Sequence, residues 1–176
     1  MPAMRAWIGL GANLGDAAAT IARAIDAIDA LPSTRVVRVS SLYRSAPVDA
    51  QGPDFVNAVA EIETTLSPPA LLAQLRAIET GEGRRRPYRN APRTLDLDLL
   101  LASDADAPLR IDSPSLVLPH PRMHLRAFVL APLAELDPRL TVPGHGHVAD
   151  LLAACTGQRI ERIGATPRHL PAAAPR

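Results

Sequence analysis

The 176-residue sequence predicts a single α+β domain with a ferredoxin-like βαββαβ sheet and both of its long helices on one face. Short stretches that alternate apolar and polar residues, as strands do, are interleaved with two longer stretches whose apolar residues recur every three or four positions, as in helices. The length suffices for one sizeable core but not for two typical domains. We expect the domain to span residues 1–166 and the Pro- and Ala-rich end, 167–176, to be frayed.

The first half of the pattern is expected to contain three strands and one helix. Residues 6–11 (AWIGLG) form the first strand, and Asp16 is a suitable N-cap for the helix that follows. The apolar stripe of this helix consists of Ile21, Ile25, Ile28 and Leu31. Residues 35–45 and 55–64 are then predicted to be strands, joined by the loop 47–53.

The second half begins with a helix that has Ser67 before it and Pro68 at its first position, an arrangement typical of helix starts. Its apolar stripe consists of Leu71, Leu75 and Ile78. A basic loop follows, and residues 95–101 complete the sheet. The rest of the chain is predicted to add only short elements, namely a small hairpin over 109–118 and helices over 121–130 and 148–154.

Composition excludes several classes of function. The net charge of +1 argues against a generic binder of nucleic acid, and no window approaches a membrane span. A single cysteine, Cys155, cannot form an internal disulfide, and no signal peptide is recognisable, so we expect a cytoplasmic protein. All 19 basic residues are Arg, which rules out a Walker A loop and a Schiff-base lysine.

Two carboxylates are set into the last predicted strand. Because residues two apart share a face, Asp96 and Asp98 lie together, about 6.6 Å apart along the backbone. The leucines between and beside them, at positions 95, 97 and 99, point to the other face, where the helices pack. An ordinary half-exposed strand is the alternative, but two like charges this close need a counter-ion. The pair is a candidate site for divalent metal.

An arginine-rich loop precedes this strand. Five of the ten residues from 84 to 93 are Arg. Alone, the loop would be read as a solvated charge run or a nucleic-acid patch. Next to the carboxylates it indicates phosphoryl transfer, because guanidinium groups bind phosphate oxygens and Mg²⁺ links phosphate to carboxylate.

Further candidates lie in two other segments. Phe55 and Asn57 are expected on the same open face as the aspartates, where a ring and a carboxamide can stack on a flat heterocycle and recognise its edge. His120 begins a predicted helix, where N–H groups favour anions, and Arg122 and Arg126 follow one turn apart.

Two motifs are set aside. The glycines of GLGANLG (9–15) lack the GxGxxG spacing and no parallel βαβ unit follows, which argues against a dinucleotide site. His120 and His124 have i,i+4 spacing without the Glu of HExxH, and the histidines of 145–147 are read as exposed residues on a glycine turn.

Four segments in order resemble the 6-hydroxymethyl-7,8-dihydropterin pyrophosphokinase family over roughly residues 5–155. They are IGLGANLGD near the start, FVNAV (55–59), RNAPRTLDLDLL (89–100) and PHPRMHLRAF (119–128). The resemblance implies transfer of pyrophosphate from ATP to the hydroxymethyl group of the pterin, with release of AMP. It also implies two Mg²⁺ ions bound with ATP, and a monomer.

The resemblance assigns a role to each matching position. Asp96 and Asp98 would ligand Mg²⁺, with Arg84 and Arg93 as catalytic phosphate-binding residues. ATP would also contact Leu99, His120 and Arg126. The pterin would contact Ser45, Val48, Phe55, Asn57, Asp96 and Phe128, and Glu79 would support the site.

The chain also departs from the family pattern. Asn90 and Ala91 replace a tryptophan and a glycine common in the arginine loop, and the choice among Arg84, Arg85 and Arg86 stays open. Two rival functions are an RNA-binding ferredoxin-like domain and a regulatory module that binds a small molecule. The first conflicts with the scarcity of aromatic residues, and the second leaves the paired carboxylates unexplained.

Overall fold

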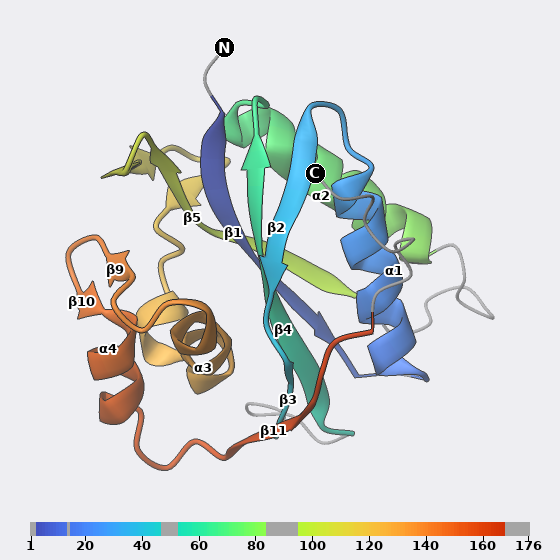
Figure 1. Ribbon diagram of the computed structural model, residues 1–176, viewed down its shortest axis with the longest axis vertical. Coiled ribbons are helices and arrows are strands. Elements are labelled where there is room, and N and C mark those ends of the chain that lie inside the picture. Colours follow the sequence, from blue (N-terminus) through green and yellow to red (C-terminus); the bar gives the residue numbers. More distant parts are fainter. Residues whose placement is uncertain (1–2, 14, 47–52, 84–94, 168–176) are drawn as a thin grey trace.

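The computed structural model describes residues 3–13, 15–46, 53–83 and 95–167. Within them, an antiparallel sheet of seven strands runs through the middle of the molecule (Figure 1). The strand order is β11-β3-β4-β1-β5-β6, and β2 pairs with the other half of β4. The three central strands are β1 (Met4–Ala12), β4 (Phe55–Thr64) and β5 (Asp96–Asp104), and the outer ones are β2 (Thr34–Val39), β3 (Leu42–Ser45), β6 (Ala107–Pro108) and β11 (Ile160–Gly164).

The two long helices, α1 (Ala17–Asp29) and α2 (Pro68–Gly83), pack on one face of the sheet, as predicted (Figure 1). The side chain of Asp16 accepts a hydrogen bond from the Ala19 N–H at 3.1 Å, which confirms Asp16 as the N-cap of α1. The predicted stripes face a cluster of buried residues that contains Ile21, Ile25, Ile28, Leu71 and Leu75. We call this the helix-side core.

The opposite face is only partly open. Helices α3 (Ala127–Leu136) and α4 (Val148–Ala154) cover one end of it and form a second core with Trp7, Val59 and Leu101. We call it the second core. Two-stranded sheets formed by β7 (Ile111–Asp112) with β8 (Val117–Leu118), and by β9 (Thr141–Val142) with β10 (Gly146–His147), complete the described chain.

Two predicted elements are wrong in detail. The single strand expected over 35–45 is broken at Ser40 and Ser41 into β2 and β3, and the Ser40 hydroxyl accepts the Val59 N–H at 2.9 Å. The helix expected over 121–130 is divided into a 3₁₀ turn, η1 (Met123–Leu125), and α3, because Arg126 between them has an extended backbone. The start of α3 is therefore displaced by six residues from the expected Pro121.

A bulge interrupts β5 at Leu100. Ile8 of β1 pairs with Leu99 and Trp7 pairs with Leu101, so Leu100 has no partner in β1. Before the bulge, Leu97 and Leu99 point into the helix-side core; after it, Leu101 points into the second core. The odd-numbered leucines of β5 therefore lie on one face of the sheet before the bulge and on the other face after it.

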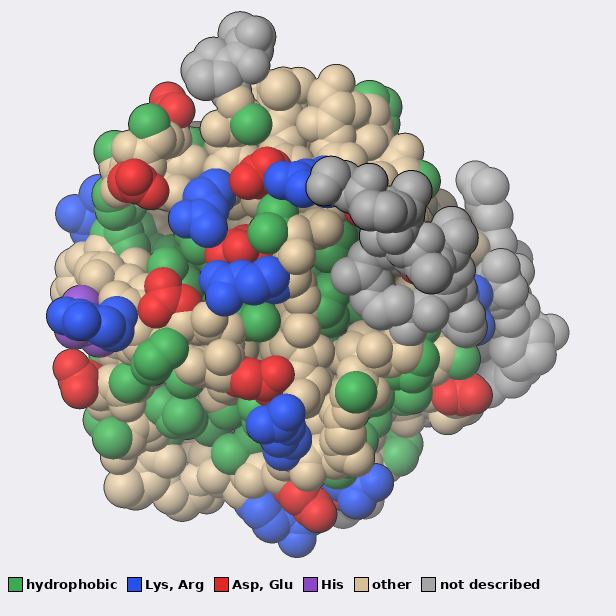
Figure 2. All heavy atoms as spheres, in the orientation of Figure 1, with side chains coloured by type: hydrophobic (Ala, Val, Ile, Leu, Met, Phe, Trp, Pro, Cys, Tyr) green, Lys and Arg blue, Asp and Glu red, His purple; other side chains and the backbone are tan. Residues whose placement is uncertain are grey.

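The outer surface near β2 carries charges of both signs. Figure 2 shows arginine and acidic side chains interleaved over this strand. Arg35 and Glu63 are paired at 2.8 Å and Arg38 and Glu61 at 3.0 Å, both across β2 and β4. Because these charges neutralise one another, this region is not a surface of one sign.

Candidate active site

A cavity of about 830 Å³ opens on the second face of the sheet, beside the part that α3 covers. Its walls come from the three central strands, from the end of β3, from η1 and α3, and from α2. The lining residues used below are Gly9, Gly11, Ser45, Phe55, Asn57, Arg76, Glu79, Asp96, Asp98, Leu125, Arg126, Phe128 and Gln158. Seven of the residues predicted for catalysis or binding are thus brought together.

The floor of the cavity is a trough between an acidic side and an amide side. Gly11 of β1 pairs with Asp96 of β5 on one side and with Asn57 of β4 on the other. Gly9 likewise lies between Asp98 and Val59. A Cβ on Gly11 would lie 3.3 Å from the Oδ1 atom of Asn57. The glycines are therefore the positions at which missing side chains keep the trough open.

The two aspartates lie on the cavity face, as expected. Asp96 is exposed and Asp98 is half-buried, whereas Leu97 between them is fully buried in the helix-side core. Leu95 and Leu99 point the same way as Leu97. The alternation read from the sequence is thus confirmed for this part of β5.

Helix α2 holds the backbone between the aspartates. The Leu97 N–H donates to Glu79 Oε2 at 2.8 Å, and Arg76 Nη1 donates to the Leu97 carbonyl at 3.0 Å. Arg76 and Glu79 are themselves paired at 2.7 Å. This contact satisfies the edge of β5 next to the carboxylates, and the supporting role expected of Glu79 in the site stays a prediction.

The amide side is built from β3 and β4. Asn57 is buried, with 5% of its surface exposed, and its Nδ2 donates to Ser45 Oγ at 2.8 Å. Phe55 precedes it on β4 and pairs with Ser45. Across the cavity, the Phe128 ring lies with its centroid 5.5 Å from the guanidinium carbon of Arg126.

His120 lies near this site without lining the cavity. Its backbone N–H donates to the Leu100 carbonyl at 2.9 Å, and its Nδ1 accepts the Arg122 N–H at 3.2 Å. Burial lowers the pKa of His120, and the opposing influence of the Asp98 carboxylate does not offset it. The neutral ring therefore carries its proton on Nε2.

Four predicted site residues need separate mention. The Leu99 side chain is buried in the helix-side core, so the structure does not bring it to the cavity. Val48, Arg84 and Arg93 lie outside the described residues, as do Arg85 and Arg86.

Several lining residues were not predicted from the sequence. Gly9 and Gly11 had no predicted role in the site: they belong to the family segment IGLGANLGD and to a glycine pattern rejected as a dinucleotide loop, which the antiparallel pairing of β1 also excludes. Their positions opposite Asp98 and Asp96 would have followed from the strand order. Arg76 could also have been found, because a residue three positions before Glu79 on a helix lies on the same face of that helix. Gln158 carried none.

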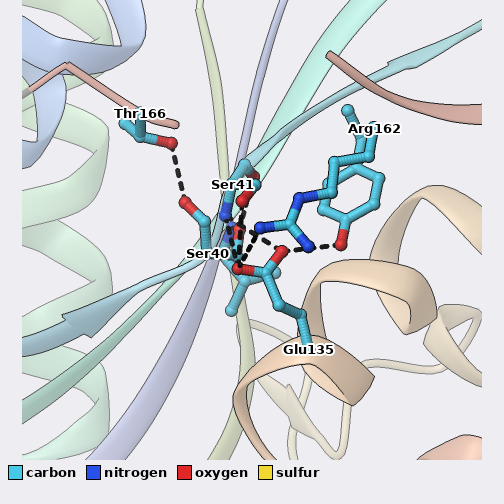
Figure 3. Close-up of polar contacts among 7 residues, drawn as sticks. Ser40, Ser41, Glu135, Arg162 and Thr166 are labelled. Carbon is cyan, nitrogen blue, oxygen red and sulfur yellow. Dashed lines mark hydrogen bonds and ion pairs between the residues drawn. The ribbon is translucent and has the colours of Figure 1, made fainter. Parts of the chain in front are cut away.

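A second polar cluster connects α3 to the break between β2 and β3 (Figure 3). Glu135 accepts hydrogen bonds from the Ser41 N–H at 2.9 Å and the Tyr43 hydroxyl at 2.6 Å, and Arg162 of β11 lies 4.0 Å away. Burial alone would raise the pKa of Glu135, but these hydrogen bonds outweigh it and lower the pKa. Thr166 donates to the Ser40 carbonyl at 2.7 Å. The cluster fixes β3, and with it Ser45, relative to α3.

Fold and cavity together define a class of protein, an α+β enzyme. A pair of strand carboxylates, an arginine and two aromatic rings around one cavity fit the transfer of a phosphoryl-type group to a flat acceptor.

The chain belongs to the 7,8-dihydro-6-hydroxymethylpterin-pyrophosphokinase family, whose model matches residues 7–138. It is 48% identical over 160 residues to the 2-amino-4-hydroxy-6-hydroxymethyldihydropteridine pyrophosphokinase of Pseudomonas aeruginosa, covering 90% of this chain and 96% of the relative. It is 43% identical over 148 residues to the protein of the same name from Haemophilus influenzae, covering 84% of this chain and 90% of that one. The predicted family is confirmed, and so is the predicted reaction, pyrophosphoryl transfer to hydroxymethyldihydropterin in folate biosynthesis.

Solved structures show the same fold. A Plasmodium falciparum HPPK-DHPS structure with pterin and p-hydroxybenzoate superposes with a TM-score of 0.67 over 86% of this chain, at 13% identity. The chain spans 43% of the length of that protein. The likeness supports the mixed α/β architecture with its antiparallel sheet.

Proposed function

We propose that the cavity beside α3 is the site at which the chain brings ATP and 6-hydroxymethyl-7,8-dihydropterin together. The observation that carries the proposal is the trough itself, in which Asp96 faces Asn57 across Gly11 and Asp98 faces Val59 across Gly9. One wall suits a metal-bound polyphosphate, and the other suits a flat, polar heterocycle.

Asp96 and Asp98 are the residues that would hold Mg²⁺. Within the described part of the chain, no group of three or more His, Cys, Asp and Glu side chains is placed to hold a metal. Two carboxylates from one strand fit an ion that takes its other ligands from phosphate oxygens and water, as Mg²⁺ does in many nucleotide sites. When bound, Mg²⁺ would neutralise phosphate charge. Two such ions, as the family resemblance implies, remain part of the proposal.

The pterin would occupy the amide side. Phe55 and Phe128 both line the cavity and offer apolar faces for stacking. Asn57 already donates to Ser45, so its Oδ1 and remaining N–H can face a heterocycle edge. Val48 is proposed to contribute from outside the described residues.

The polyphosphate would lie towards η1 and α3. Arg126 lines the cavity, and the Nε2–H group of a neutral His120 is a suitable donor to a phosphate oxygen. Arg84 and Arg93, which lie outside the described residues, are proposed to bind the phosphates and to offset their negative charge during transfer. Because the side chain of Leu99 is buried, we propose that only its backbone contacts ATP.

Transfer would then depend mainly on position and charge. The hydroxymethyl oxygen attacks the β-phosphorus in line with the departing AMP oxygen, and the pyrophosphoryl group moves as a unit. Arg126 and the backbone held by Glu79 and Arg76 orient the two substrates. Negative charge that builds on the oxygen leaving with AMP would be offset by Mg²⁺ and the arginines within a partly closed cavity.

The remaining proposals concern the whole molecule. The order β5-β1-β4-β2 supports a ferredoxin-like assignment for the core. No helix among the described residues is long and apolar enough to cross a membrane. We propose a cytoplasmic monomer that binds neither nucleic acid nor membranes.

The test is incubation with Mg-ATP and hydroxymethyl-dihydropterin, followed by separation of the nucleotides. We expect AMP to form in equal amounts with pterin diphosphate. Formation of ADP instead, or of AMP without the pterin, would contradict the proposal. Binding of RNA with a steep salt dependence and no turnover would favour the RNA-binding alternative.

A further inference from the structure

The short segment after α4, residues 157–160, borders the cavity at Gln158 and contacts both the junction of η1 with α3 and strand β3. We call it the strap. It follows the segment 7–138 that the family model matches. Gly157 has a φ of +80°, which favours glycine and turns the chain so that Gln158 lines the cavity. On the other side, Ile160 pairs with Ser45 of β3.

Gln158 makes two hydrogen bonds to backbone groups on either side of Arg126. Its Nε2 donates to the Leu125 carbonyl at 2.8 Å, and its Oε1 accepts the Ala127 N–H at 2.9 Å. The first group ends η1 and the second begins α3, so one carboxamide satisfies a helix end and a helix start. Arg126 itself makes no side-chain capping bond there.

This arrangement bears on the direction in which Arg126 points. Its backbone is extended, with φ −115° and ψ 109°, between two helical segments. The backbone of Arg126 is bonded on both sides: its N–H donates to the Met123 carbonyl at 3.3 Å, and its carbonyl accepts the N–H groups of Val129 and Leu130, both at 3.0 Å. The two Gln158 bonds add to these at the neighbouring peptide groups, and together they fix the junction from which the Arg126 side chain projects. The guanidinium group is then placed over the Phe128 ring and against the cavity.

We propose that Gln158 is a positioning residue for the reaction, which fixes Arg126 in the orientation needed to bind the polyphosphate. The inference rests on the proposed function of the cavity. Gln158 acts through Arg126, and the strap couples that position to the β3 side of the cavity through Ile160. A small displacement of a group that contacts the reacting phosphates is costly to the rate.

The test compares Gln158→Met, which keeps the length of the side chain and removes both hydrogen bonds, with Gln158→Glu, which retains the acceptor for Ala127 alone. Gln74→Met in α2 is the matched control, because Gln74 does not line the cavity. AMP formation is measured with ATP and pterin varied separately, and thermal unfolding is measured in parallel. For Gln158→Met we expect a roughly tenfold lower kcat/KM, mostly as a higher KM for ATP, with a nearly unchanged Tm. Gln158→Glu should lose less, and Gln74→Met nothing.

A double-mutant cycle with Arg126→Ala separates positioning from general stabilisation. In the Arg126→Ala background we expect Gln158→Met to change kcat/KM less than twofold. An unchanged rate for Gln158→Met in the otherwise natural chain would overturn the inference. So would the same tenfold loss in both backgrounds, or a loss that follows a lower Tm. Failure of the unaltered chain to make AMP would instead contradict the proposed function, and this inference with it.

Discussion

The two faces of the same three strands differ in what they contain. On one face, Leu97, Leu99 and Ile62 pack under α1 and α2 with less than 5% of their surfaces exposed. On the other, the neighbouring residues Asp96, Asp98 and glycines 9 and 11 border a cavity. One face is filled to stabilise the fold, and the other is left partly empty.

This difference teaches that a residue that stabilises the fold and a residue that serves the site can be direct neighbours in one strand. Because successive side chains point to opposite faces, a residue of the core and a residue of the site can be adjacent in sequence. Substitutions one position apart should therefore have opposite effects on activity and on stability.

The largest effect is expected for a matched pair at adjacent positions. Asp98→Asn removes a charge that we place on the metal, and we expect a loss of about 10³-fold in kcat with little change in Tm. Leu97→Ala leaves a cavity in the helix-side core and should cost about 2–5 kcal/mol of unfolding free energy, while its folded fraction stays active. Steady-state kinetics and urea unfolding on both variants measure the contrast.

The comparison would be broken if Asp98→Asn kept a rate within tenfold of the unaltered chain. It would equally be broken if Leu97→Ala unfolded at the same urea concentration as that chain. Magnesium titration of Asp98→Asn should also require more metal for any residual rate.

A smaller effect is expected at the floor of the trough. Gly11→Ala places a methyl group 3.3 Å from Asn57 Oδ1, so the amide must shift and the pterin side must narrow. We expect roughly a tenfold higher KM for the pterin, while unfolding free energy stays equal or rises by about 0.5 kcal/mol.

Gly81→Ala in α2 is the control for this change, because a Cβ at Gly81 would have no atom within 4 Å. It should raise stability by about 0.5–1 kcal/mol without changing either KM. Equal KM values for the pterin in Gly11→Ala and Gly81→Ala would contradict the prediction, because they would show that a methyl group at position 11 does not hinder pterin binding.

The smallest effect concerns pH and two stacked histidine rings, one of them from η1. His124 stacks on His145 with centroids 3.6 Å apart, and burial, followed by repulsion from His145, lowers the pKa of His124 below its ordinary 6.5. Below pH 6.5 the unfolded chain therefore takes up a proton that the folded chain does not, and stability falls as the pH falls.

His124→Phe keeps a ring for stacking and removes this proton uptake. Urea unfolding at pH 7.5 and 5.5 should show a smaller loss for the variant, by on the order of a few tenths of a kcal/mol, since the side chain is partly exposed. A loss in the variant as large as in the unaltered chain would assign the pH dependence to other groups.

The helix-side face was the predictable one. The stripes of α1 and α2, the N-cap at Asp16 and the alternation around Asp96 and Asp98 follow from local periods of the sequence. The second core was not predicted, because it joins residues far apart in the chain, such as Trp7 and Leu133, and Arg126 divides a helix that the apolar pattern shows as continuous. Gln158 could not be found from the sequence either, since its partners are about 30 residues earlier and are backbone groups.

The extra residue at Leu100 has a consequence for how wet and dry compartments share one sheet. Had β5 kept a constant step of two, the side of the ribbon that presents Asp96 and Asp98 would have continued with even-numbered positions, and Leu101 would have pointed away from α3. Leu100 continues the side of Asp96 and Asp98 into the second core, and the bulge adds Leu101 to that side, which is therefore polar at the cavity and apolar where it meets α3. The bulge thus gives a nine-residue strand two successive leucines in a core that excludes water, directly after two carboxylates that border the cavity.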